Sequence, residues 1–283
     1  MNFLDDSWLV GTSTGLYAAA DRRWERLGAY QFIVTGFDRS GGRVLASTGS
    51  GLWEIRQDRW VQRHDETLTE VMDVIDEGDR MIAASAYGIA FGRTEPSEAT
   101  RWDWLSDGLS INQRFTNALL SLADGRIVAA TEAGVMIHSQ ETEWQATSLQ
   151  GTPVRCLARW RDSYLAGSDE GVWSSDDAKS WHLTDRDGPV CALASGRSHV
   201  LAGTEDGVCV STDARQWRTA GLGGMRIGAV ETSRADDDCW YAGGVPGGLW
   251  MTRNRGQTWV DVPEVISDVN AISAPPGFAT EGL

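Results

Sequence analysis

The chain has almost no lysine: Lys179 is the only one among 283 residues, and 25 basic residues stand against 40 acidic ones. The net charge is −15 at pH 7 and the isoelectric point is about 4.6. Binding to phosphate backbones requires a stripe of basic side chains, and the sequence contains none. We therefore exclude nucleic acid as a partner. The excess of acid is typical of a salt-adapted organism, but it also keeps an ordinary protein in solution, and both explanations stay open.

Cysteine and histidine are scarce, with four residues of each. The cysteines form no Cys-x-x-Cys pair, and no histidine stands at ligand spacing from them, so we expect no metal and no cofactor. Cys156 and Cys191 fall one register apart on the predicted innermost strands of neighbouring repeats. We interpret all four, including Cys209 and Cys239, as small buried thiols, and a disulfide between Cys156 and Cys191 is the alternative.

Long hydrophobic runs are also missing, and residues 1–6 contain two acids and no basic residue. A signal peptide needs a basic start followed by an apolar run, and a membrane-spanning helix needs about 20 predominantly apolar residues. Neither pattern occurs in the sequence. We therefore predict a cytoplasmic protein with no membrane partner.

Tryptophan, by contrast, is abundant, with 14 residues against six phenylalanines and five tyrosines. Seven times, a turn of small residues that ends in glycine is followed by a tryptophan about ten residues later. The glycine spacings are 36, 37, 46, 37, 36 and 41 residues. A period near 40 with strand-like filling predicts the blades of a β-propeller. The glycines are Gly15, Gly51, Gly88, Gly134, Gly171, Gly207 and Gly248, and the tryptophans are Trp24, Trp60, Trp102, Trp144, Trp181, Trp217 and Trp259.

The pattern of short apolar runs and polar turns in each repeat predicts four short strands. The predicted fold class is therefore all-β: a seven-bladed β-propeller with four-stranded antiparallel blades, forming a single domain over residues 1–283. Residues 8–12 match the second strand of a blade and residues 269–272 match a first strand. We predict that the C-terminal strand joins the N-terminal blade and closes the ring, which removes exposed sheet edges. The predicted blades are residues 7–27 plus 265–277, 30–64, 69–106, 114–149, 152–184, 188–221 and 225–263.

A local motif precedes three of the repeat tryptophans, at residues 174–181, 211–217 and 252–259. These segments resemble the Asp-box, S-x-D-x-G-x-T-W, of the BNR/sialidase-type propellers, which include sialidases, sortilin-like receptor domains, xyloglucanases and photosystem II assembly factors. The resemblance implies structural turns that lie away from the ligand face, in which the acid bonds its own turn and the indole packs between blades. A ring of lectin-like tryptophan platforms is the alternative. The residues with this implied role are Ser174, Asp176, Trp181, Asp213, Trp217, Asn254, Gly256 and Trp259.

Sialidase activity is not carried over from the resemblance. It would use three arginines on a substrate carboxylate, a tyrosine nucleophile paired with a glutamate, and a separate aspartic acid. The chain has no early Arg-Ile-Pro segment, and its five tyrosines have no evident glutamate partner. We assign no catalytic residue.

The ligand face of a propeller is built from the loops between blades and from the turns between second and third strands. The chain also varies at residues 93–100 and 234–238, and loops are where function usually lies. Three arginines stand just before or within innermost strands, where they could converge near the axis and hold a carboxylate or phosphate. The alternative is that they pair with nearby acids. The candidate ligand-binding residues are Arg114, Arg155, Arg226, His64, Asp65 and Asp187.

We predict a non-catalytic β-propeller that binds a protein partner or a small anionic ligand on its inter-blade loop face, as a scaffold or assembly factor. One alternative is an enzyme of glycosidase or lyase type, acting on a sugar or carboxylated substrate in the axial funnel. It requires at least two arginines and a titratable group, such as His64, Asp65 or Asp187, in one axial pocket. A second alternative is a lectin-like glycan binder, which requires several tryptophans exposed on the ligand face.

Overall fold

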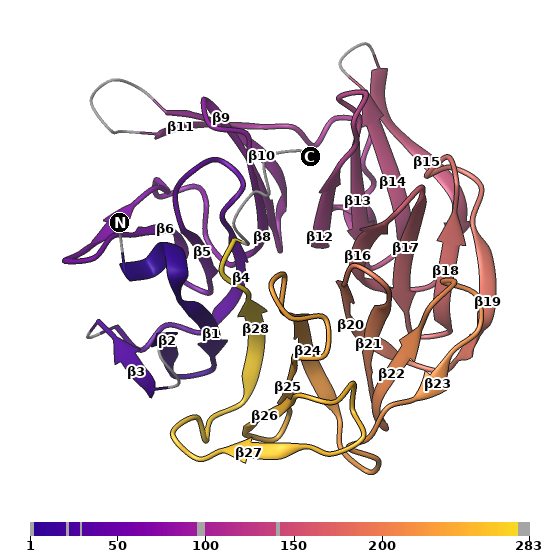
Figure 1. Ribbon diagram of the computed structural model, residues 1–283. Helices are drawn as coiled ribbons and strands as arrows, with labels where there is room; N and C mark the ends of the chain where they lie inside the picture. The colour runs from indigo at the N-terminus through magenta and orange to yellow at the C-terminus, as the bar shows by residue number, and fades with distance from the viewer. Residues whose placement is uncertain (1–2, 21–22, 29, 95–99, 140–141, 277–283) are drawn as a thin grey trace, which may run out of the picture.

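The computed structural model describes residues 3–20, 23–28, 30–94, 100–139 and 142–276. Its strands form seven antiparallel sheets of four strands each, arranged as blades around a central axis (Figure 1). The seven-bladed β-propeller predicted from the repeats is therefore confirmed. A 3-10 helix, η1 (Phe3–Asp6), precedes the first strand, and a four-residue helix, α1 (Ile111–Arg114), connects the third blade to the fourth.

The blades follow one another along the chain, and the strands of each blade succeed one another from the axis outward. Blade 1 contains β28 (Val269–Ser273), β1 (Trp8–Thr12), β2 (Gly15–Ala20) and β3 (Arg23–Leu27). Blade 2 contains β4 (Val34–Asp38), β5 (Leu45–Thr48), β6 (Gly51–Ile55) and β7 (Trp60–Gln62). Blade 3 contains β8 (Val71–Asp76), β9 (Arg80–Ser85), β10 (Gly88–Thr94) and β11 (Thr100–Trp104). Blade 4 contains β12 (Thr116–Ser121), β13 (Ile127–Thr131), β14 (Gly134–Ser139) and β15 (Thr142–Gln150).

The last three blades have the same order. Blade 5 contains β16 (Val154–Trp160), β17 (Ser163–Ser168), β18 (Gly171–Ser175) and β19 (His182–Asp187). Blade 6 contains β20 (Val190–Ser195), β21 (Val200–Thr204), β22 (Gly207–Ser211) and β23 (Arg218–Thr219). Blade 7 contains β24 (Ile227–Thr232), β25 (Trp240–Gly244), β26 (Leu249–Thr252) and β27 (Val260–Val262).

The two ends of the chain share blade 1, as predicted. β28 pairs antiparallel with β1, with Val10 opposite Ile272 and Gly11 opposite Ala271. Val10 and Val269 are fully buried in the cluster that joins blade 7 to blade 1. The C-terminal strand therefore completes a sheet whose other three strands come from the first residues of the chain.

The hydrophobic core is divided among the seven boundaries between blades. Each of seven buried clusters contains residues of two consecutive blades. The repeat tryptophan of each blade packs against the blade before it; Trp102 of blade 3, for example, joins Leu45 and Leu52 of blade 2. The indoles therefore act as wedges that hold neighbouring sheets together.

The turn glycines have the backbone conformation expected from their spacing. All seven have positive φ, from +92° to +149°. At Gly51, where φ is +100°, a Cβ would also stand 2.4 Å from Cγ of His64. Only glycine fits such a position without strain.

Candidate functional site

A bulge on every innermost strand forms a ring of seven residues around the axis, six of which have side chains. In each blade the pairing between the first and second strand skips the second residue of the inner strand. Bulges of this kind turn a side chain away from the ladder and are common beside binding sites. The skipped residues are Thr35, Met72, Asn117, Arg155, Cys191, Gly228 and Asn270.

Four consecutive members of this ring line an axial cavity of about 680 Å³ at blades 5, 6, 7 and 1. Arg155 and Arg226 both line the cavity, together with Asp169, Glu205 and the Cys191 thiol. The structure therefore brings together two of the three predicted arginines with titratable groups, which is the arrangement that the enzymatic alternative requires.

Both arginines are engaged by acids. Arg155 donates to Glu132 at 2.6 Å and to Asp169 at 3.2 Å, and Arg226 stands 3.0 Å from Glu205. Burial opposes the charged form of Arg155, but the hydrogen bond to Asp169 and the negative charges of Glu132 and Asp169 outweigh it and raise its pKa. The expected alternative, that these arginines pair with nearby acids, is the arrangement that the structure has.

The four cysteines are free thiols, so the alternative of a Cys156–Cys191 disulfide is not present. Cys209 and Cys239 are buried as expected, whereas Cys156 and Cys191 are half-buried, and Cys191 lines the axial cavity. Burial raises the pKa of Cys191 although Arg226 lies beside it. The thiol is therefore protonated at neutral pH and is a poor nucleophile there.

The other predicted ligand-binding residues do not line the axial cavity. Arg114 ends α1 and is exposed. The His64 ring packs over Gly51, and its Nδ1 lies 2.9 Å from the Leu52 carbonyl oxygen. Asp65 accepts hydrogen bonds from the amide and hydroxyl groups of Thr67, which fixes its own turn.

Asp187 ends β19, and its side chain is 95% exposed. Its nearest ion-pair partner is Arg186, at 3.9 Å. It therefore lies on the surface of blade 5, and the structure gives it no defined contact with the axial cavity.

The turns between second and third strands are held rigid by a device that the sequence analysis missed. In six blades the hydroxyl that ends the second strand donates to the carbonyl of the turn glycine; Thr131 to Gly134 is 2.8 Å and Thr204 to Gly207 is 2.9 Å. The signal is a serine or threonine three residues before six of the seven turn glycines. The acids in these turns are therefore presented on fixed backbone.

Charge differs sharply between the two ends of the ring. We call the end formed by the blade-to-blade connections and the second-to-third-strand turns the loop face, and the end formed by the remaining connections the opposite face. The described connections contain eleven acids and three arginines on the loop face, but eleven acids and twelve basic residues on the opposite face. The loop-face acids are Asp65, Glu66, Glu70, Asp107, Glu132, Asp169, Glu170, Glu205, Asp206, Glu264 and Asp268.

Large exposed hydrophobic side chains gather on the same face. Nine occur among the described residues; three of them, Trp104, Leu183 and Val260, lie on outermost strands. The remaining six all belong to loop-face segments, with Ile111 83% and Ile266 77% exposed. These six are Tyr30, Ile33, Tyr87, Ile111, Phe115 and Ile266.

The turns before the repeat tryptophans lie on the opposite face. In blade 6 the Asp213 carboxylate accepts hydrogen bonds from the amides of Arg215 and Gln216 and from the Ser211 hydroxyl. In blade 7 the Asn254 side-chain oxygen accepts from the Thr258 amide at 2.9 Å. Asp213 and Asn254 therefore stabilise their own turns.

The assignment in blade 5 is corrected by one residue. Asp177, not Asp176, accepts bonds from the amides of Lys179 and Ser180, and its hydroxyl partner is Ser175 rather than Ser174. These bonds hold the pKa of Asp177 well below its usual range, the Ser180 amide contributing most. Two serines followed by two aspartates offer two registers, and the structure adopts the shorter turn that blade 6 also uses.

The repeat tryptophans are mostly buried, which does not favour the lectin-like alternatives. Trp181 is 4% exposed and Trp102 is 7% exposed. The indole N–H groups of Trp102, Trp144 and Trp259 each donate to a backbone carbonyl 39 residues earlier, in the previous blade. The rings therefore act within the core rather than as platforms on the loop face.

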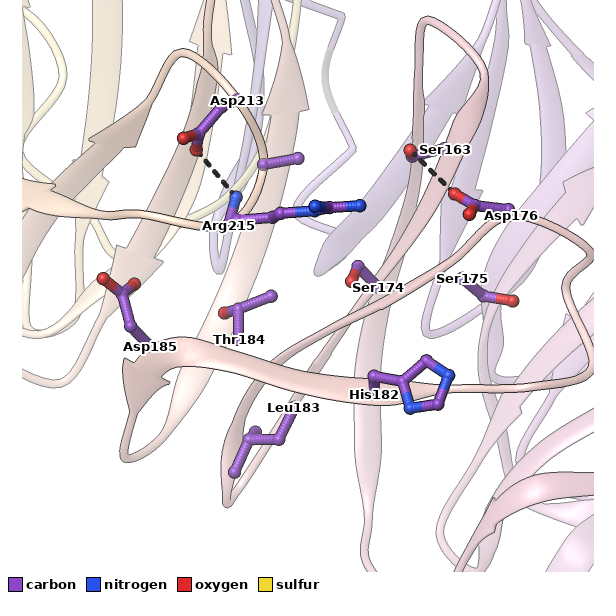
Figure 2. A pocket seen from close by; sticks show the side chains of 11 residues that line it. Ser163, Ser174, Ser175, Asp176, His182, Leu183, Thr184, Asp185, Asp213 and Arg215 are labelled. Atoms are coloured by element: carbon purple, nitrogen blue, oxygen red, sulfur yellow. Dashed lines mark hydrogen bonds between the residues drawn. The ribbon is translucent and has the colours of Figure 1, made fainter.

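A groove of about 430 Å³ lies between blades 5 and 6 on the opposite face (Figure 2). Figure 2 shows His182 toward one end and Asp185 and Asp213 toward the other. Asp213 bonds the amide of its own turn and Asp185 accepts from the Trp217 amide at 3.0 Å. These acids stabilise the junction of two turns, so we assign the groove a structural role.

The two variable segments have different outcomes. Residues 95–99 of the first lie outside the described part of the chain. In the second, Asp237 accepts hydrogen bonds from the Arg197 amide and the Ser198 hydroxyl of blade 6 and lies 3.3 Å from Nδ1 of the buried His199. Residues 234–238 therefore brace blade 7 against blade 6 on the opposite face.

Comparison with known proteins supports the fold. No protein family matches the sequence, and no curated protein does. The extracellular domain of a protein described as a one-component system from B. thetaiotaomicron superimposes with a TM-score of 0.72 at 13% identity, over 89% of this chain and 37% of that one. YCF48 from Cyanidioschyzon merolae gives 0.62 at 14% identity, over 93% and 90%. An ancestral GH74 enzyme gives 0.61 at 16% identity, over 77% and 36%.

The chain thus spans little more than a third of the length of the first and last of these proteins. At such identities the likeness concerns the propeller fold and not the activity. In the described part of the chain, no helix has the length and apolar character needed to cross a bilayer.

Proposed function

We propose that this protein is a non-catalytic propeller of the BNR/Asp-box type that binds a protein partner on its loop face. The observation that carries the proposal is the gathering of all six loop-region hydrophobic side chains on the face where acids outnumber arginines by eleven to three. The hydrogen-bonded turns around Asp177, Asp213 and Asn254 support the assignment to the Asp-box type.

Burial of such side chains supplies the affinity in this proposal. Covering an exposed isoleucine contributes about 1.5–3 kcal/mol, so a few anchors outweigh the entropy lost on docking only when they act together. Exposed hydrophobic groups on a rigid surface with a charged rim are typical of protein interfaces. The acids would speed the encounter with a basic partner and suppress acidic ones.

The test uses one variant on the loop face and one on an outermost strand. Ile111→Ser removes a loop-face anchor, and Val260→Ser removes an outer-strand side chain that is 59% exposed. Each tagged variant and the wild type are incubated with lysate of the host organism, and retained proteins are identified by mass spectrometry. We expect a partner that the wild type and Val260→Ser retain and Ile111→Ser loses. A partner retained equally by all three would contradict binding through this face.

A small ligand in the axial cavity is the second candidate. Asn270 lines this cavity, and its side-chain nitrogen is buried with no hydrogen-bond partner among the described residues, so an unused donor lies near Arg226. Thermal unfolding in the presence of citrate or phosphate tests this: wild type should be stabilised and Asn270→Ala should not. An equal response of both proteins would exclude the cavity as the site.

A further inference from the structure

We propose that the loop face binds an extended, basic segment of a partner protein, which inserts one aliphatic or aromatic side chain between blades 3 and 4. The inference rests on the proposed function and specifies the chemistry of the partner. It starts from a second loop-face cavity, of about 520 Å³, that separates these two blades. Its lining includes Ile111, Phe115, Ala133 and Glu132.

The cavity has an apolar rim that the fold itself does not require. Ile111 is 83% exposed, Phe115 is 37% exposed, and Tyr87, next to the lining residue Ala86, is 56% exposed. No residue of α1 is buried. These side chains contribute little to the core. Burying them stabilises the protein only when another surface covers them.

The rim is also held in a fixed position. Oε1 of Gln113 accepts hydrogen bonds of 2.9 Å from the amide and the hydroxyl of Ser110. The Ser110 carbonyl in turn accepts from the amides of Gln113 and Arg114. A preorganised turn loses little entropy when Ile111 is covered, which favours binding.

A chain of ion pairs leads from this cavity to the acidic turns of the next blades. Glu132 lines the cavity and bonds Arg155 at 2.6 Å, and Arg155 in turn contacts Asp169 at 3.2 Å. Asp169 and Glu170 are exposed in the turn of blade 5, and the turn of blade 6 has Glu205 and Asp206 at the same positions. The apolar cavity between blades 3 and 4 is thus followed, in one direction around the ring, by the carboxylates of the turns of blades 5 and 6.

Charge complementarity selects the occupant. A second copy of this chain would bring the same excess of acids against the loop face, and nucleic acid or an anionic membrane would be repelled by it. Lysine or arginine side chains that follow an apolar anchor would meet the turns of blades 5 and 6. Because these turns lie on consecutive blades, an extended segment reaches them more readily than a single helical turn does.

The experiment selects peptides from a displayed library of random 12-residue sequences on the immobilised full-length protein. The selected consensus peptide is then synthesised with a fluorophore, and its affinity is measured by anisotropy at several salt concentrations. We expect an aliphatic or aromatic residue followed by lysine or arginine, and an affinity that falls as salt rises.

Three variants locate the contact. Ile111→Ser should weaken binding about tenfold, and the pair Glu170→Gln with Asp206→Asn should weaken it about fivefold at low salt and flatten the salt dependence. Val260→Ser should bind within about twofold of the wild type, since it changes an exposed hydrophobic side chain on an outermost strand, away from the loop face. All altered residues are exposed, so unfolding temperatures near that of the wild type are expected and are measured for each variant.

Selection of acidic or uncharged peptides, or no selection at all, would overturn the inference. So would an affinity unchanged by Ile111→Ser, or a concentration-dependent dimer that Ile111→Ser abolishes. If Ile266→Ser weakens binding and Ile111→Ser does not, the anchor between blades 3 and 4 is wrong while binding through the loop face stands. Retention of the lysate partner by all variants would instead reject the proposed function.

Discussion

Glu132 accepts a hydrogen bond of 2.6 Å from Arg155, and the pair links the axial cavity, which Arg155 lines, to the cavity between blades 3 and 4, which Glu132 lines. Glu132 belongs to a turn fixed by the Thr131 hydroxyl, and Arg155 is the bulged residue of its blade. Arg155, which the sequence analysis names as a candidate for binding an anionic ligand, is therefore paired with two carboxylates of the protein itself. Its position makes the acids of blades 4 and 5 parts of one surface.

The indole hydrogen bonds between blades should contribute measurably to the free energy of unfolding. The indole nitrogen of Trp102 donates a hydrogen bond of 2.7 Å to the Arg63 carbonyl. The indole nitrogen of Trp181, in the same place in blade 5, is buried with no partner in the part of the chain that the structure describes. Both substitutions to phenylalanine remove ring volume, but only Trp102→Phe also removes a hydrogen bond between blades. We expect Trp102→Phe to lower the free energy of unfolding by about 1–2 kcal/mol more than Trp181→Phe, measured by urea denaturation. Equal losses would mean that packing alone matters.

The corrected register of the blade 5 turn gives a matched pair of substitutions. Asp177→Ala removes the acceptor for two amides and two hydroxyls, and Asp176→Ala removes a single contact of 3.3 Å with Ser163. We expect the first to lower stability by about 1 kcal/mol and the second to leave it nearly unchanged. Thermal unfolding distinguishes them, and the reverse order would restore the register expected from the sequence.

Asp73, on the innermost strand of blade 3, should make stability depend on pH. Burial raises its pKa from 3.8 to about 7, although the amides of Leu119 and Val74 bond it and lower the pKa, and the charge of Asp38 raises it further. Between about pH 4 and pH 7 the unfolded chain loses a proton that the folded protein keeps, so the free energy of unfolding falls as pH rises and levels off above pH 7. The contribution is on the order of 2–4 kcal/mol.

Asp73→Asn removes this titration. The difference in unfolding free energy between Asp73→Asn and the wild type should therefore increase from pH 4 to pH 8. Glu231, whose pKa burial also raises to about 7, titrates in both proteins and cancels in the comparison. A difference that stays constant with pH would show that Asp73 is ionised in the folded ring throughout.

We expect that the closing strand can be removed from the chain and replaced by a separate peptide. A protein ended after Asp268 lacks β28 and leaves the edge of β1 unpaired, so we expect a lower unfolding temperature and a broader transition. A synthetic peptide of residues 268–276 should restore both, and a scrambled peptide of the same composition should not. A truncated protein that melts like the full chain would contradict ring closure by this strand.

The repeat spacing was sufficient to predict the number of blades, the closing strand and the positive φ of Gly51, because these depend on turn geometry and on strands of fixed length. It placed the tryptophans between blades for the same reason. It did not separate Asp176 from Asp177, since Ser-Ser-Asp-Asp satisfies two registers that differ only in turn length. Only the position of the following strand relative to Trp181 decides between them.

The candidate site was less accessible to sequence analysis. Arg155 and Arg226 were placed near the axis correctly, but the bulge that aims Arg155 depends on pairing between strands, which no local pattern reveals. The exposure of Ile111 is likewise invisible in a sequence, where isoleucine suggests a core position. Its surroundings, with Ser110 before it and Gln113 after it, indicate a turn, which is the signal that could have placed it at the surface.

Hydrogen–deuterium exchange of the full-length protein with and without the selected basic peptide tests most directly whether the loop face is the binding surface. We expect slower exchange in residues 105–115 and in the turns at 132–133 and 169–170, and no change in the opposite-face turns at 176–181 and 253–259. Slower exchange confined to those opposite-face turns, with residues 105–115 unaffected, would contradict the account.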